Sequence, residues 1–147
     1  MTLLTGARAL EDFAARLASV VDAGDTIALT GELGAGKTSF ARGLLRGLGH
    51  SGEVPSPTFT LMQVYEPPGV RLPVWHVDLY RLDGAAEADA LALEEGGHAL
   101  TLIEWPERLG GRLDPRALHL TIEGAGTPAR RLTAHVPPAW EGRWPHT

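Results

Sequence analysis

Hydrophobic residues recur at helical spacing near the beginning of the chain. Leu10, Phe13 and Leu17 are three or four residues apart, and two valines continue the series. This period places apolar side chains on one face of an amphipathic helix. The pattern predicts a helix over residues 6–22, with Gly24 beyond its end.

The next segment combines a strand pattern with a second helix pattern. Residues 26–30 (TIALT) form a short apolar run of strand length. The apolar positions of residues 40–48 fall on one helical face, and Gly49 ends that pattern. Because residues 31–36 between them are rich in glycine, the expected order is strand, glycine-rich loop and helix.

The second half of the chain alternates between strand-like and helix-like segments. Residues 67–69 (PPG) separate two strand-like runs and predict a hairpin. Alanine, leucine and glutamate dominate residues 85–95, which predicts a helix. The expected strands of this half are residues 59–66, 72–77, 99–103, 118–122 and 131–136.

Composition narrows the class of protein. The 147 residues are 44% hydrophobic, which suits one domain with a single core. With 18 acidic and 13 basic residues the net charge is −5, so unaided binding to a nucleic-acid backbone is disfavoured. The absence of cysteine excludes disulfides and thiolate metal sites. No apolar run approaches the roughly 18 residues that span a bilayer, so we expect a cytoplasmic protein without membrane contact.

One lysine stands among twelve arginines. It is Lys37, in the octapeptide GELGAGKT of residues 31–38, which matches the phosphate-binding P-loop pattern G-x-x-x-x-G-K-[ST]. A P-loop requires a compact ammonium that acts as a point charge on the phosphates, whereas arginine presents a planar fork. Chance would produce the four fixed positions in well under ~1% of chains of this length. We therefore expect the chain to bind a nucleoside triphosphate.

The flanks of the loop fit phosphate binding. Its glycines permit backbone angles that turn successive N–H groups toward anionic oxygens, and the following helix contributes the positive end of its dipole. The Thr38 hydroxyl is suited to binding magnesium. Guanine specificity is disfavoured because the sole lysine is in the loop and the chain has no asparagine. ATP and Mg²⁺ are the expected cofactors.

Alternating helices and strands around a P-loop predict an α/β fold. We expect a single P-loop NTPase-like domain over residues 1–136, with a mixed β-sheet flanked by helices. Residues 137–147, which begin with two prolines, are interpreted as a C-terminal tail.

Two carboxylates follow apolar runs and are candidates for the magnesium side of the site. Asp78 comes after residues 74–77 and Glu104 after residues 100–103. In a P-loop sheet the strand ends beside the loop carry such an acid. The spacing does not decide which of the two binds the metal directly, and an ordinary solvated acid remains the alternative for each.

Three further residues are candidates with simpler alternatives. Thr58 lies in a loop where P-loop switch proteins sense the γ-phosphate, although a proline turn with incidental hydroxyls also fits. Trp105 either covers the nucleotide or packs into the core. His76 lies within a strand and is interpreted as structural.

Four segments together resemble the bacterial TsaE (YjeE) family. They are GELGAGKTSFARGLLRGLG, SPTFTLMQVYE, HVDLYRL and LIEWPERL, in that order. The resemblance covers about residues 26–108. It implies that Thr38 and Glu104 contact magnesium, that Asp78 is the second acid and that Thr58 lies in a switch-like loop. The nucleotide contacts it implies are Leu33, Gly34, Ala35, Gly36, Lys37, Thr38, Ser39 and Trp105.

The resemblance also implies a function. Members of this family work in forming threonylcarbamoyladenosine in tRNA, hydrolyse ATP weakly alone and act with the TsaB–TsaD threonylcarbamoyltransferase complex. Contact with tRNA is expected only through that complex, and Lys37, Thr58, Asp78 and Glu104 are the expected catalytic residues. A small-molecule kinase that uses the same loop is the alternative, although 147 residues leave little chain for an acceptor pocket and a lid. A nucleotide-binding adaptor with incidental hydrolysis is a third possibility.

Overall fold

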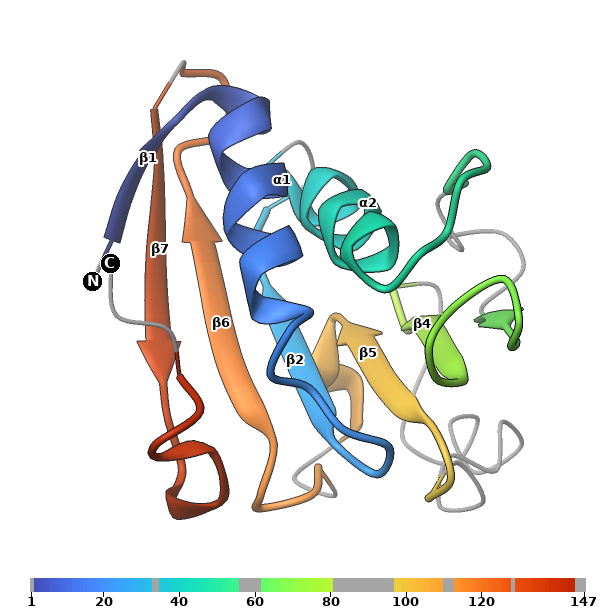
Figure 1. The fold of residues 1–147 in the computed structure, drawn as a ribbon. Helices are drawn as coiled ribbons and strands as arrows, with labels where there is room; N and C mark the ends of the chain where they lie inside the picture. Colours follow the sequence, from blue (N-terminus) through green and yellow to red (C-terminus); the bar gives the residue numbers. More distant parts are fainter. Residues whose placement is uncertain are drawn as a thin grey trace.

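Among the residues that the structure describes, seven strands form one mixed sheet in the order β1-β7-β6-β2-β5-β4-β3 (Figure 1). The computed structural model describes residues 2–32, 35–55, 62–80, 97–109, 113–127 and 129–144. Within these ranges the elements are β1 Thr2–Thr5, α1 Gly6–Leu17, β2 Thr26–Thr30, α2 Lys37–Gly47, β3 Met62–Tyr65, β4 Val74–Asp78, β5 Leu100–Glu104, η2 Pro106–Leu109, β6 Leu118–Glu123, β7 Ala129–His135 and η3 Pro138–Trp140.

The centre of the sheet is parallel and its margins are antiparallel. Strands β4, β5, β2 and β6 run in the same direction, whereas β3 pairs antiparallel with β4, and β7 pairs antiparallel with both β6 and β1. The carboxyl ends of the four parallel strands therefore meet at one edge of the sheet, the edge at which α/β proteins bind ligands. This confirms the expected α/β fold with a mixed sheet.

Helices α1 and α2 pack against each other over the same face of the sheet (Figure 1). Glycine permits their close approach, since a Cβ built on Gly43 of α2 would lie 2.1 Å from the carbonyl oxygen of Glu11 in α1. The buried core between the helices and the sheet includes Phe13, Leu44 and Leu102. A smaller cluster, Val77, Leu79, Ile103 and Leu109, lies apart from that core.

The elements largely follow the hydrophobic pattern. The strand at residues 26–30 is confirmed, and the predicted hairpin is present as β3 and β4, with Met62 opposite Val77. Helix α1 ends at Leu17 rather than at residue 22, because the chain tightens into a turn in which the Val20 amide bonds the Leu17 carbonyl at 3.0 Å. The helix expected at residues 85–95 lies outside the described residues.

Two features near the chain ends were not anticipated. The hydrophobic pattern gave no sign of β1, a four-residue strand whose partner β7 is more than 120 residues away in sequence. The segment interpreted as a tail packs back onto the domain, with Trp140 only 1% exposed. Arg143 donates hydrogen bonds to the Asp25 carboxylate at 2.7 Å and to the Val20 carbonyl at 3.0 Å.

No helix within the described ranges combines the length and the apolar character required to cross a bilayer.

Candidate functional site

The glycine-rich loop joins the end of β2 to the beginning of α2. Gly36 precedes the helix with a φ of 116°, and no side chain caps the helix N-terminus. A Cβ built on Gly36 would lie 2.6 Å from Cδ2 of Leu10, and the positive φ at this position is one that favours glycine. The first N–H groups of α2 have no partner within the helix, which is the arrangement that binds anions at helix N-termini.

Lys37 begins α2 and its side chain folds back over the loop. Its Nζ donates a hydrogen bond to the Gly31 carbonyl at 2.7 Å and lies 3.7 Å from the centroid of the Trp105 ring. The residue is 5% exposed. Burial lowers the pKa of Lys37, and the negative charges of Glu104, Asp78 and, third, Glu107 partly oppose that shift. The ammonium is therefore held at the loop by contacts on two sides.

The two candidate acids lie side by side at the carboxyl ends of adjacent strands. Asp78 of β4 pairs with Glu104 of β5, and Glu104 also pairs with Leu29 of β2, two residues before Gly31. Asp78 is 2% and Glu104 3% exposed. Asp78 Oδ1 accepts a hydrogen bond from the Tyr80 amide at 2.9 Å. The fold thus brings both acids to the loop, and neither is an ordinary solvated residue.

His76 also belongs to this group, although the sequence gave it a structural role. Its Nε2 lies 2.6 Å from Oε2 of Glu104, and its side chain is fully buried. The alternation of side chains along a strand could have revealed this contact. His76 and Asp78 are two residues apart on one strand, so their side chains point to the same face.

Trp105 packs partly into the smaller apolar cluster and also lies beside the glycine-rich loop. It adopts a φ of 61°, and its amide donates to the Leu29 carbonyl at 3.3 Å. Its ring lies over the Lys37 ammonium, and it packs against the ring of Tyr80 with 4.8 Å between centroids. The indole is half-buried, and it forms a wall of the site as well as part of the smaller apolar cluster.

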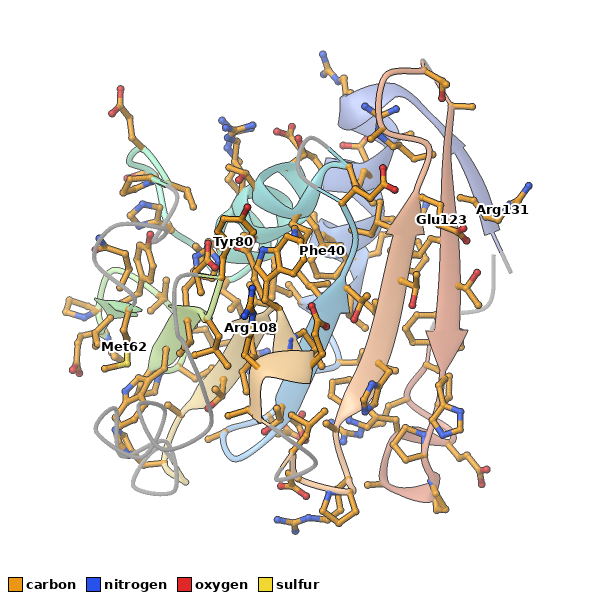
Figure 2. All side chains as sticks on the ribbon, turned by 180° about the vertical axis from the view of Figure 1, so that it is seen from behind. Phe40, Met62, Tyr80, Arg108, Glu123 and Arg131 are labelled. Carbon is orange, nitrogen blue, oxygen red and sulfur yellow. The ribbon has the colours of Figure 1, made fainter. Side chains whose placement is uncertain are left out.

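A pocket of about 460 Å³ adjoins the loop. Its walls come from the ends of β2 and β6, the beginning of the glycine-rich loop and the turn after β6. The lining residues are Thr30, Gly31, Glu32, Ala35, Trp105, Thr121, Ile122, Glu123, Gly124 and Ala125. Glu123, which pairs with Arg131 of β7, lies at the top of β6 in the view from behind (Figure 2). The pocket therefore extends from the glycine-rich loop toward the β6–β7 turn.

Arg130 of β7 is a second cation beside the loop that sequence reasoning missed. Its Nε would lie 3.8 Å from a Cβ built on Gly36. Its Nη1 donates to the Gly124 carbonyl at 2.9 Å, whereas its buried Nε has no hydrogen-bond partner among the described residues. The antiparallel pairing of β6 with β7, both of which the sequence predicted as strands, brings Arg130 to the loop.

The donor set fits a magnesium ion that is shared with phosphates. Hydroxyl and carboxylate oxygens are the ligands that Mg²⁺ prefers, and nucleotide sites supply one or two carboxylates besides the phosphates. Thr38 is the second residue of α2, and the Asp78 and Glu104 carboxylates are both buried. In the part of the chain that the structure describes, no group of three or more His, Cys, Asp or Glu residues could hold a metal by itself.

The structure describes most of the predicted loop residues. Ala35 is 1% exposed and Ser39 lies in the first turn of α2. Leu33, Gly34 and Thr58 lie outside the described residues.

Comparison with known families gives one clear match. A family model described as "Threonylcarbamoyl adenosine biosynthesis protein TsaE" matches residues 4–132. The chain is similar to the tRNA threonylcarbamoyladenosine biosynthesis protein TsaE of Bacillus subtilis, with 40% identity over 75% of this chain and 68% of that protein. It is also similar to the protein of the same name from Streptomyces coelicolor, with 41% identity over 79% of this chain and 80% of that protein.

A solved structure has the same architecture. The crystal structure of Bacillus subtilis YdiB matches with a TM-score of 0.80 and 30% sequence identity, over 97% of this chain and 88% of that chain. The fold of this chain is a single-domain, P-loop NTPase-like α/β fold.

Proposed function

The chain belongs to the TsaE family, which takes part in tRNA threonylcarbamoyladenosine biosynthesis, and from this premise we propose that it is a magnesium-dependent ATPase of that pathway. The proposal extends to its partner: ATP hydrolysis drives turnover of the TsaB–TsaD threonylcarbamoyltransferase complex in the cytoplasm. Contact with tRNA occurs through that complex, since the chain itself carries a net charge of −5.

One observation carries the ATPase proposal. The sole lysine, the N-terminus of α2 and two buried carboxylates converge at the carboxyl edge of the parallel strands. Phosphoryl transfer requires a cradle for the phosphates and an acid on the magnesium side. Lys37 and the loop amides supply the cradle, and Asp78 and Glu104 supply the acid.

Each part has a distinct task in the proposed reaction. The loop amides and the Lys37 ammonium bind the β- and γ-phosphates and neutralise the charge that develops on the transferred group. Thr38 and Glu104 would hold the magnesium ion, which when bound neutralises phosphate charge and orients the β- and γ-phosphates. Asp78, in the buried position beside Glu104, orients the attacking water or the hydration shell of the metal.

The pocket beside the loop supports nucleotide binding. It opens from Gly31 and Ala35, whose neighbours hold the phosphates, toward Gly124 and Ala125 in the β6–β7 turn. Its volume lies within the range of small-molecule sites. We assign this space to the nucleoside, with Trp105 as the wall nearest to Lys37.

The experiment that tests the role compares ATP turnover with and without partners. Purified protein is assayed alone and with the TsaB–TsaD pair, at fixed Mg²⁺, beside a Lys37→Ala control. We expect slow turnover alone, a clear increase with the complex and loss of both in the control. No increase with the complex would contradict the proposed role in its turnover.

The same assay separates the kinase alternative. A kinase transfers the γ-phosphate to a metabolite, so that one phosphorylated product appears for each ATP consumed. The ATPase releases inorganic phosphate stoichiometrically instead. Detection of a phosphorylated acceptor in place of inorganic phosphate would favour the kinase.

A further inference from the structure

His76 and Glu104 form a buried polar pair within the sheet. Nε2 of His76 lies 2.6 Å from Oε2 of Glu104. The His76 side chain is fully buried and that of Glu104 is 4% exposed. A buried carboxylate without a hydrogen-bond donor is strongly destabilising, so this contact helps to keep an ionised Glu104 in place.

Strand register explains why these two residues meet. His76 pairs with Leu102, and Asp78 pairs with Glu104, on the parallel strands β4 and β5. Because side chains alternate along a strand, these residues share the face on which the helices pack, and His76 is the diagonal neighbour of Glu104. The histidine therefore contacts Glu104 from a rigid element rather than from a loop.

The ionised form of Glu104, which is the form that binds a metal, sets the direction of the hydrogen bond. An ionised carboxylate only accepts hydrogen bonds, so His76 donates from Nε2–H. In the neutral ring Nδ1 then carries a lone pair and no proton. Nδ1 is buried and has no hydrogen-bond partner among the described residues, and an unpaired acceptor is tolerated better than an unpaired buried N–H.

We propose that His76 is a positioning residue for Glu104. The hydrogen bond from Nε2 occupies Oε2 and holds the carboxylate in one orientation, leaving its second oxygen for the metal that accompanies the nucleotide. Groups that orient the ligands of a metal typically change metal affinity or activity by about 10–100-fold when they are replaced. This inference rests on the proposed function, because it takes Glu104 as the acid on the magnesium side.

The test compares two replacements that differ in one donor. His76→Gln retains an N–H donor that reaches toward Glu104, whereas His76→Met fills the buried space without a donor. ATP affinity is measured by calorimetry for each protein, once with Mg²⁺ and once with EDTA. The ratio of the two affinities reports how much Mg²⁺ contributes to ATP binding, separately from the contact of Lys37 with the phosphates. The measurement requires no turnover.

We expect His76→Met to reduce this ratio by about tenfold and to leave ATP affinity in EDTA unchanged. His76→Gln should keep a ratio close to that of the unmodified protein. In a Glu104→Gln background, His76→Met should have no further effect, because the carboxylate that it positions is gone. Thermal unfolding is measured for each variant as a control for folding. If His76→Met does not fold, it is replaced by His76→Asn, whose shorter amide does not reach Glu104.

Two results would overturn the role of His76. One is an unchanged affinity ratio in His76→Met. The other is a decrease of that ratio by His76→Met that is equally large with Glu104 and in the Glu104→Gln background. Failure of the proposed function looks different: the unmodified protein would then bind no ATP, or would bind it with no contribution from Mg²⁺. If Glu104→Gln removes the magnesium contribution while His76→Met does not, only the positioning role is wrong.

Discussion

The ammonium of Lys37 lies 3.7 Å from the centre of the Trp105 ring, a cation–π contact between the glycine-rich loop and the end of β5. Trp105 reaches this position with a φ of 61°, which is unusual for any residue but glycine. Such backbone angles cost on the order of 1–3 kcal/mol and concentrate at functional sites. A polyphosphate in the loop would compete with the ring and with the Gly31 carbonyl for the ammonium.

Replacing Lys37 tests the phosphate cradle. Lys37→Ala removes the charge that we propose contacts the phosphates, and hydrogen bonds to charged groups contribute about 1.5–3 kcal/mol, which corresponds to roughly a 10–100-fold weaker Kd for ATP. Lys37→Arg should also weaken binding, because a planar guanidinium does not fit a 5%-exposed position built for an ammonium. Calorimetry gives both affinities.

A matched control removes a cation from the same helix. Arg46 lies near the end of α2 with its side chain 59% exposed, so Arg46→Ala should leave ATP affinity unchanged. Full ATP affinity in Lys37→Arg would contradict the requirement for a compact ammonium.

The pKa of Lys37 is open to direct measurement because the chain has no other lysine. Burial lowers this pKa from 10.5, and Glu104 and Asp78 partly oppose the shift. The pH dependence of amine acetylation, followed by mass spectrometry of the Lys37 peptide, should have its midpoint below 10.5. In Glu104→Gln the midpoint should move lower still, because one opposing negative charge is lost.

The lowered pKa of Lys37 also predicts how the stability of the protein changes with pH. A lysine whose folded-state pKa is lowered binds fewer protons when folded than when unfolded, between its two pKa values. The contribution of Lys37 to stability therefore increases with pH as the pH rises through that window. A midpoint of the Lys37 acetylation profile at or above 10.5 would contradict the expectation that burial has the largest effect on this pKa.

Trp105 should report nucleotide binding by its fluorescence. The chain contains four tryptophans, and Trp105 is the one that contacts Lys37 and lines the pocket. We expect ATP to change the emission of the unmodified protein, and Trp105→Phe to remove most of that change. Trp144→Phe, which alters a ring packed on Phe13, should preserve it. Loss of the signal in the second variant alone would refute this assignment.

The C-terminal segment should contribute to folding stability. Trp140 is 1% exposed within residues that the sequence interpretation treated as a tail. Trp140→Ala should lower the free energy of unfolding by about 3–5 kcal/mol, the usual cost of truncating a buried tryptophan. Denaturant unfolding measures the change, with the exposed Glu141→Ala as control. Equal stability of the two variants would show that the segment does not stabilise the domain.

Local patterns were sufficient for several parts of the fold and site. Four or five apolar positions on one face predicted α1 and α2, and the short run before the loop predicted β2. Their signals lie within a single helix or strand, so residues close in sequence carry them. The loop was identified in the same way, since its glycines and its lysine are contiguous.

Other parts depended on contacts between distant segments. Strand β1 is defined by pairing with β7, and Arg130 reaches the loop only because β7 lies in the same sheet. The sequence proposed both Asp78 and Glu104 for strand ends beside the loop, and the parallel register of β4 and β5 placed them side by side. His76 joined the site through that same register.

The sequence by itself determined that this chain has a P-loop: a single lysine, two glycines and a threonine at fixed spacing specify a phosphate cradle because the backbone amides that form it are adjacent in the chain. Only the tertiary structure decided which charges surround that cradle. Coulombic and hydrogen-bond energies depend on distance through space, and the register of the strands sets that distance.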